Sequence, residues 1–596
     1  MSELEGIAVP AGEVWAALRL ALEDRFAEDL FWLQIAEDAN GITVRGQVVS
    51  EDVKEAIVEI VSVTFPNAVI FNEILATSPL YPANQNHFDI DVGVDVNFEA
   101  AATVVRHPRI SCEHELYVGR SYVFEVDLSL DPDQETVGAP IELTPEDPNW
   151  ESLLVTVEFS SYELEIEPED ARRNITLFRG GNSKPARFAA KVKAEAASIG
   201  AANVKAIFST ADRVRGFASR RFDIIPIAQG VNPGPKILTA PGTIGDFVHD
   251  ASPAPSLTVK IQHNPHSPGE CTWSFEAPGF RDMVEAYSFH QINLGTSAKA
   301  YFQDKFMQVK TLQDGKHQGI LRGIGEEIWG AAPVQFHRLY LAMTQKIGNA
   351  FPIQIFSDEP YVPWELMHPT ASDTNDPDHL CMRHPIARWT MTRALVSTIP
   401  KGGIVSFVPD YPDGSLPAAL EEGRWLCTTY GATACTPTYA AFTQCLNVPV
   451  SEPVAVLHFA GHGAGEEADP RQRGLRMTDG WVSIEEINSA VKLGNRDRSL
   501  VVVNACHAGS QTSVLGAVHG WPAAFIKVGF GAVIAPLWAV QDETACKVMK
   551  RAVAELYGTG NSLGSAVTEA RRENRDKSAA AFSYVLHGDV MAHVNT

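Results

Sequence analysis

The chain has 596 residues, a formal net charge of −25 and 45% hydrophobic residues. This length is too great for one hydrophobic core and predicts several domains. The acidic balance argues against a protein that binds nucleic acid directly, because such a protein needs a basic surface.

No stretch reaches the ~18 apolar residues of a membrane span, and no basic-plus-apolar leader opens the sequence. The eight cysteines are scattered without a CxxC pair, whereas a secreted disulfide scaffold would be small and dense in cysteine. We therefore expect a cytoplasmic protein with reduced thiols and no membrane span, in which a special cysteine must be recognised from its neighbours.

Residues 1–85 are predicted to form a small α+β domain. The segment GITVRGQVVS (41–50) alternates as a strand does, EDVKEA then opens a helix, and AVIFNEIL (68–75) returns as a strand. This order resembles a BON domain, and an unrelated small α+β unit is the alternative.

Residues 86–230 are predicted to form a β-sandwich of immunoglobulin-like shape. Segments with period-two alternation are separated by turn signals, for example SLLVTVEFSSYELEIE (152–167) and ARFAAKVKAEA (186–196). We see no catalytic pattern there and expect a binding or spacer role. Residues 231–256 are rich in Pro and Gly and predict a linker.

Residues 257–596 predict an α/β domain. Three near-continuous apolar strands, VAVLHFA (454–460), SLVVVNA (499–505) and GAVIAPLW (531–538), alternate with helical patterns. Such strands are typical of a mostly parallel sheet that is covered on both faces. Further strands are predicted at 351–358 and 402–409, and helices at 298–312, 333–346, 416–430, 438–446, 543–557 and 562–573.

Two of these strands end in unusual residues. The first is followed by AGHGAG, which contains His462, and the second runs directly into Cys506. Loops at the carboxyl ends of parallel strands are where such sheets bind ligands, so we expect the two side chains to be neighbours. A thiolate attacks a carbonyl far better than a thiol, and an imidazole can take the thiol proton and later give it to the leaving amine. Glycines beside the histidine leave room for a substrate and for amides that bind an oxyanion.

Four ordered segments together resemble the CHAT domain, a caspase-like cysteine peptidase of clan CD. These are IQIFSDEPYVPWELMHP, HFAGHG with ACHAGS, GFGAVIAPLWAVQDETA, and GNSLGSAVTEARRE. The sequence GHGAGE also resembles the histidine loop of separase. The resemblance covers roughly residues 280–596 and implies a caspase-like fold.

Carried over by position, the resemblance implies that His462 is the base and Cys506 the nucleophile, with the backbone amides of Gly463 and Cys506 as the oxyanion hole. Many caspase-like proteases carry an acidic residue two positions before the cysteine, where it binds a basic P1 side chain. Asn504 stands there in this chain, which puts a basic preference in doubt. Asp542 is a substitute candidate for the substrate pocket; alternatively, it caps the helix that begins near Thr544.

Other histidines have structural and metal-binding interpretations. His458 precedes His462 by four residues, but the glutamate of an HExxH motif is missing, so a structural role is favoured over a ligand in a metal hydrolase. HLCMRH (379–384) with His368 upstream could hold zinc, although the spacing is irregular. The expected chemistry needs no cofactor or metal, and no GxxxxGK[ST] loop is present.

The resemblance thus implies a cysteine endopeptidase that cleaves a specific protein partner, in a regulated bacterial defence or cell-death pathway. The N-terminal domains are then expected to bind a regulatory protein. The alternative is a catalytically silent caspase-like scaffold that binds partners through those domains.

Overall fold

The computed structural model describes short pieces of residues 7–76, then residues 104–225 and 253–595 with gaps, the longest being 144–149, 284–288, 311–315 and 465–473. The described chain contains several sheets and many helices, so it is a mixed α/β protein as predicted. It divides into two compact units, Met1–Val96 and Asn97–Thr596. The predicted linker 231–256 falls almost entirely outside the described residues.

The first unit holds one four-stranded sheet and a helix. Its strands are β1 (Ile7–Ala8), β2 (Leu30–Asp38), β3 (Gly41–Val48) and β4 (Ile70–Ala76), and its helix is α2 (Glu51–Thr64). The strand, helix and strand predicted for 41–75 are present, and β3 pairs with β4 in parallel, as a crossover through α2 requires. The likeness to a BON domain stays a prediction.

The second unit begins with two five-stranded sheets, ordered β10-β12-β7-β5-β8 and β11-β9-β13-β14-β6. Their elements are β5 (Val104–Ser111), β6 (Leu116–Tyr117), β7 (Ser121–Ser129), β8 (Ile141–Leu143), β9 (Ser152–Ser160), β10 (Leu164–Glu165), β11 (Arg172–Phe178), β12 (Ala186–Val192), α3 (Ala196–Ile199), β13 (Ala201–Thr210) and β14 (Arg213–Ile225). Apolar residues from both sheets, among them Phe124 and Phe159, share one core. The predicted alternation is visible in β12, where every second residue is buried.

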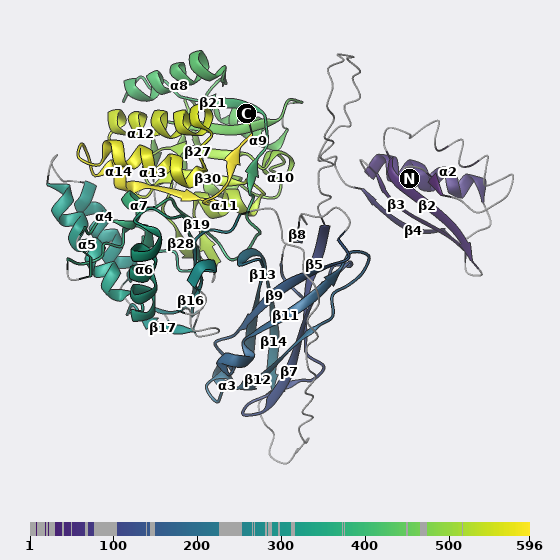
Figure 1. Ribbon diagram of the computed structural model, residues 1–596. Helices are drawn as coiled ribbons and strands as arrows, with labels where there is room; N and C mark the ends of the chain where they lie inside the picture. Colours follow the sequence, from purple (N-terminus) through teal and green to yellow (C-terminus); the bar gives the residue numbers. More distant parts are fainter. Residues whose placement is uncertain are drawn as a thin grey trace, which may run out of the picture. The chain divides into compact units, whose positions relative to one another are not determined.

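The rest of the unit is built on a large sheet packed with helices (Figure 1). This sheet has eleven strands in the order β17-β16-β15-β18-β19-β31-β30-β27-β23-β21-β22. Its strands are β15 (Leu257–His263), β16 (Glu270–Glu276), β17 (His290–Asn293), β18 (Ile353–Ser357), β19 (Ile386–Trp389), β21 (Gly403–Phe407), β22 (Thr433–Ala434), β23 (Val454–Ala460), β27 (Leu500–Asn504), β30 (Ala532–Pro536) and β31 (Tyr584–His587). Most neighbouring pairs are parallel, including β21, β23, β27 and β30 in sequence across the sheet.

Helices cover both faces of this sheet. They are α4 (Ala298–Lys310), α5 (His317–Ala331), α6 (Val334–Ile347), α7 (Leu380–Arg383), α8 (Pro417–Tyr430), α9 (Tyr439–Asn447), α10 (Leu493–Asp497), α11 (Trp521–Lys527), α12 (Asp542–Ala554), α13 (Leu563–Asn574) and α14 (Ala580–Ser583). Val456, Val502 and Ile534 face a core shared with α8, α12 and α13, whereas the adjacent Leu457, Val501 and Val533 face another shared with α9 and α11. Burial on both faces explains why these strands are continuously apolar.

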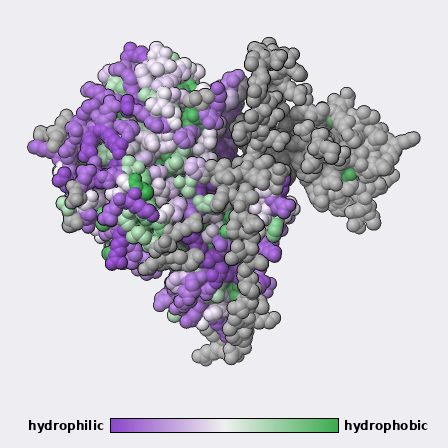
Figure 2. Space-filling view, in the orientation of Figure 1, coloured by the Kyte–Doolittle hydropathy of each residue, from purple (hydrophilic) through white to green (hydrophobic). Residues whose placement is uncertain are grey.

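Small strands complete the chain: β20 (Thr398–Ile399) pairs with β32 (His593–Val594), β24 (Gly463–Ala464) with β25 (Gly474–Arg476) and β25 with β26 (Trp481–Val482), and β28 (Thr512–Val514) with β29 (Ala517–His519). Among the described helices, none has the length and apolar character needed to cross a bilayer. The described surface on the face drawn in Figure 2 is mostly hydrophilic, with small apolar spots.

Candidate active site

The loops that carry His462 and Cys506 lie against each other. β23 and β27 pair in parallel with Ala460 opposite Asn504, so each candidate residue stands two positions beyond the last paired residue of its strand. The amide of Gly461 donates to the carbonyl of Asn504 at 3.2 Å. A Cβ atom on Gly463 would lie 2.7 Å from the carbonyl oxygen of Cys506, so only glycine permits this approach. The structure therefore brings the two loops that carry the predicted residues together at the carboxyl edge of the sheet.

His462 is held by the loop that follows β21. Its amide donates to the hydroxyl of Tyr411 at 3.1 Å, and the rings of the two residues are 4.7 Å apart. The Tyr411 hydroxyl donates in turn to the carbonyl of Arg476 at 2.7 Å, and the guanidinium of Arg476 lies over the tyrosine ring. One guanidinium nitrogen of Arg476, Nη2, also bonds to both carboxylate oxygens of Asp413. These contacts fix both the backbone and the ring plane of His462.

One hydrogen bond decides which nitrogen of His462 can act as a base. Nε2 lies 2.8 Å from the carbonyl oxygen of Gly414, and a carbonyl oxygen only accepts, so Nε2 carries the proton. In the neutral ring the lone pair is therefore on Nδ1. Gly414 has φ 151°, and a Cβ atom there would lie 3.3 Å from Nε2, so a side chain at 414 would combine a strained backbone with crowding of the imidazole.

Cys506 begins a tight turn in which His507 adopts φ 61°, a left-handed conformation that costs a non-glycine residue about 1–3 kcal/mol. The turn is closed by the Ser510 hydroxyl, which donates to the carbonyl of His507 at 2.7 Å. It is anchored by the Gly509 amide, which donates to the carbonyl of Pro536 at 2.7 Å. The thiol is half-buried, with its sulfur 4.0 Å from the carbonyl of Val540. Such strain beside a partly exposed thiol suits a functional turn.

Asn504 is buried and bonded at both ends of its side chain. Its amide nitrogen donates to Oε2 of Glu422 at 2.9 Å, and its oxygen accepts from the Tyr584 hydroxyl at 2.7 Å. Only 6% of the residue is exposed. These contacts favour a structural role for Asn504 beneath the site, while its predicted contact with a substrate stays a prediction.

Glu422 continues this buried network to His458. Its Oε1 accepts from Nε2 of His458 at 2.7 Å, and Nδ1 of His458 lies 2.9 Å from the Ser406 hydroxyl. Both ring nitrogens of His458 are thus used inside the domain, which supports its structural role and leaves neither for a metal. Burial raises the pKa of Glu422, although His458 and Asn504 partly oppose that shift.

Asp542 lies at the start of α12, and its carboxylate accepts from the amides of Ala418 and Ala419 at 2.8 and 3.0 Å. These amides belong to the first turn of α8, so Asp542 caps a different helix from the one foreseen in the sequence. Its place in a substrate pocket stays a prediction.

Sequence reasoning missed Tyr411, Gly414 and Glu422. The first two follow the apolar strand β21, and the rule that loops at strand ends gather functional groups could have marked them. Glu422 stands within the helical pattern of α8, and no sequence signal separates it from the exposed Glu421 beside it.

Residues 333–586 match the family model of the CHAT domain, so the resemblance seen in the sequence is confirmed for that part of the chain. No curated protein matches the sequence. The structure is similar to the separase–securin complex of Saccharomyces cerevisiae, with 12% identity and a TM-score of 0.33 over 57% of this chain and 30% of that chain. Another likeness, to a structure described only as a protease, has 10% identity and a TM-score of 0.28 over 50% of this chain and 75% of that chain. Only the family match is strong enough to identify a part of the chain.

Proposed function

We propose that this chain, which carries a CHAT domain over residues 333–586, is a cysteine endopeptidase of caspase-like type. The observation that carries the proposal is the close approach of the two loops, in which Gly463 packs directly on the backbone of Cys506. The family match supports a peptidase-like domain, and the retention of both a histidine and a cysteine at this edge supports an active one.

In the proposed reaction, Nδ1 of His462 takes the proton of the Cys506 thiol and the sulfur attacks the carbonyl carbon of a peptide bond. The backbone amides of Gly463 and Cys506 stabilise the negative oxygen of the tetrahedral intermediate. The leaving amine receives the proton from His462, which leaves an acyl group on Cys506. A water molecule then releases this group, with Nδ1 again as the base. The hydrogen bond from Nε2 to Gly414 keeps Nδ1 available throughout.

A peptide with a thiol-reactive warhead tests the proposal. The full chain is treated with the probe, and mass spectrometry identifies the labelled residue. Labelling that is confined to Cys506 is the expected result. Labelling spread over the other seven cysteines would favour the silent scaffold instead.

Tyr411→Phe is expected to slow labelling by about 10- to 100-fold, because small displacements of a reacting group have effects of this size. The change removes the hydroxyl that holds the amide of His462 and the carbonyl of Arg476. Stability is expected to fall by only about 1–2 kcal/mol, as for the loss of one or two hydrogen bonds. The rate of labelling and the thermal unfolding curve are measured on the same samples.

The matched control is Tyr439→Phe, which removes the hydroxyl of an exposed tyrosine that pairs with Glu486. Its labelling rate is expected to equal that of the parent. A Tyr411→Phe chain that reacts as fast as the control would show that Tyr411 does not position His462.

The proposed substrate is a specific protein, and the proposed setting is a regulated bacterial defence or cell-death pathway. A regulatory protein partner then binds through the N-terminal parts of the chain. The β-sheets of 104–225 are tied to the α/β part by buried ion pairs, such as the one between Arg213 and Asp589. Met1–Val96 forms a separate compact unit and is therefore the part of the chain best suited to bind and release a regulatory protein.

We also propose that Met1–Val96 keeps the peptidase inactive until a signal arrives. Deleting residues 1–96 is therefore expected to raise the labelling rate of the resting protein several-fold, while the buried ion pairs of the remaining chain stay in place. The same probe and time course measure the effect. An unchanged rate, together with an unchanged melting temperature, would show that this unit does not restrain the peptidase.

A further inference from the structure

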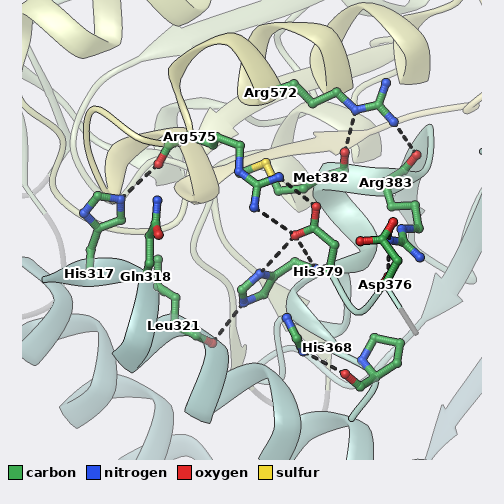
Figure 3. A network of polar contacts seen from close by, with 12 residues as sticks. His317, Gln318, Leu321, His368, Asp376, His379, Met382, Arg383, Arg572 and Arg575 are labelled. Atoms are coloured by element: carbon green, nitrogen blue, oxygen red, sulfur yellow. Dashed lines mark hydrogen bonds and ion pairs between the residues drawn. The ribbon is translucent and has the colours of Figure 1, made fainter. Parts of the chain in front are cut away.

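His368, Asp378 and His379 form a compact group apart from the candidate dyad. One ligand atom from each residue lies within 4.8 Å of the others. His368 follows the short 3-10 helix Trp364–Leu366, and the other two directly precede α7. The two histidines are only 3% and 4% exposed. Figure 3 shows the rings next to each other between α5 and the C-terminal helices.

Each histidine donates one ring N–H to a backbone carbonyl and so keeps a lone pair on the other nitrogen. Nδ1 of His368 lies 2.8 Å from the carbonyl of Pro369, which leaves Nε2 as an acceptor. Nε2 of His379 lies 3.0 Å from the carbonyl of Leu321, which leaves Nδ1 as an acceptor. Histidines that bind metals are usually oriented by such a bond from their second nitrogen. Burial, with a smaller effect from His379, lowers the pKa of His368 to about 4, so its ring is neutral at neutral pH.

Asp378 faces the free nitrogen of His379. Its Oδ1 lies 3.9 Å from Nδ1 of His379. The same Oδ1 accepts a hydrogen bond from the backbone amide of His379 at 2.9 Å. The guanidinium of Arg575 donates to Oδ2 at 2.8 Å and to Oδ1 at 3.3 Å, and it so orients the carboxylate. The carboxylate is thus held with Oδ1 beside Nδ1 of His379, where a metal cation or a proton would bind both atoms.

The backbone around the group is closely fitted. A Cβ atom on Gly325 of α5 would lie 2.5 Å from the carbonyl of Leu366, 2.7 Å from Cβ of His368 and 3.1 Å from Cδ2 of His379. Only glycine lets α5 pack so closely on the two histidines. The group thus joins α5, the segment after Leu366 and the start of α7 at one point.

We propose that Nε2 of His368, Nδ1 of His379 and Oδ1 of Asp378 bind a structural Zn²⁺ ion. Two imidazoles and one carboxylate are a ligand set that suits zinc, and water completes its tetrahedral coordination. Arg575 serves as the outer hydrogen-bond donor to the carboxylate. The ion fastens the segment that follows PWEL to α5 and takes no part in the reaction at Cys506. The alternative occupant is a proton, which would make His379 an imidazolium paired with Asp378.

The test uses the untagged full chain, treated with a chelator and then loaded with Zn²⁺ alone. Every sample carries Cys506→Ala, because a thiol with a nearby imidazole also binds zinc. The expected result is one tightly bound ion per chain by metal analysis and a higher melting temperature with zinc, because a ligand of the native state stabilises it.

Two substitutions remove a ligand atom and keep the oriented N–H. In His368→Asn the amide nitrogen replaces Nδ1, and in His379→Gln it replaces Nε2. Each is expected to weaken zinc binding by at least about 100-fold, the upper range seen when only an outer partner of a ligand is lost. The matched control is His593→Asn, which changes an exposed histidine whose Nδ1 lies 3.1 Å from the carbonyl of Gly560 and is expected to leave binding unchanged.

Equal zinc affinity in the background chain and both variants would overturn the proposal, as would a background chain that binds no ion. If a variant fails to fold, Co²⁺ loading of the background chain decides: the absorption bands of tetrahedral cobalt, removed by zinc, are expected, and their absence would overturn the site. Since peptidase activity enters none of these measurements, the outcome is independent of the proposed function.

Discussion

Replacing Cys506 by alanine is expected to abolish covalent labelling and to reduce peptide-bond cleavage by about 10⁴-fold or more. Losses of this size follow the removal of a nucleophile that acts together with its base. The cleavage rate that remains in this variant measures what substrate binding and the oxyanion amides contribute without the thiol. Folding should be unaffected, because the one polar contact of the Cys506 sulfur within the described part of the chain is a 4.0 Å approach to a carbonyl oxygen. Cleavage of a candidate protein and thermal unfolding are measured side by side.

Cys435→Ala provides the matched control. Cys435 is also half-buried, but burial raises the pKa of its thiol, which leaves less of the reactive thiolate at neutral pH. Its loss should change neither labelling nor cleavage. Comparable losses in the two variants would mean that the thiol at 506 has no special reactivity, and the silent scaffold would then be the better account.

Lys260→Met is expected to destabilise the folded state by about 3–5 kcal/mol, the cost of leaving buried charges without their partner. Lys260 on β15 is fully buried, and its ammonium group pairs with Glu158 of β9 and, at 2.9 Å, with Glu276 of β16. Without it, two carboxylates remain in the interior between the sheets of 104–225 and the eleven-stranded sheet. Denaturant unfolding, followed by fluorescence, measures the change.

Lys205→Met serves as the control for this change. Lys205 on β13 pairs with Asp358 at 2.5 Å between the same two parts, but both side chains are partly exposed. Its loss is expected to cost about 1 kcal/mol or less. Equal destabilisation by both substitutions would show that burial does not set the contribution of Lys260.

The same contact gives stability a pH dependence on the acid side. Burial alone would raise the pKa of Glu276, but Lys260 and Arg172 reverse this and hold it below its ordinary value of 4.5. Below that value the unfolded chain takes up a proton that the folded chain does not bind, so this contribution to stability is full above about pH 4.5 and falls as the pH drops. In Lys260→Met this part of the acid sensitivity should disappear.

The local sequence pattern alone predicted many of the strands and helices of the α/β part. The predicted strand 402–409 and helix 438–446 correspond to Gly403–Phe407 and Tyr439–Asn447. The apolar runs ending near 460 and 505 also located His462 and Cys506, because parallel strands end at the same edge of a sheet. These predictions succeed because periodicity reports which face of an element is buried, and that information is local.

The hydrogen-bond partners of the buried polar groups could not be read from the sequence and became known only from the tertiary structure. Tyr584 reaches Asn504, Asp542 caps α8, and His379 reaches Leu321 of α5, all through contacts between segments far apart in the chain. Likewise, β31 from the end of the chain is inserted between β19 and β30. Apolar burial needs only a pattern, since any apolar neighbour satisfies it. A buried polar atom needs one partner at one distance, and which segment supplies that partner depends on how the whole chain packs.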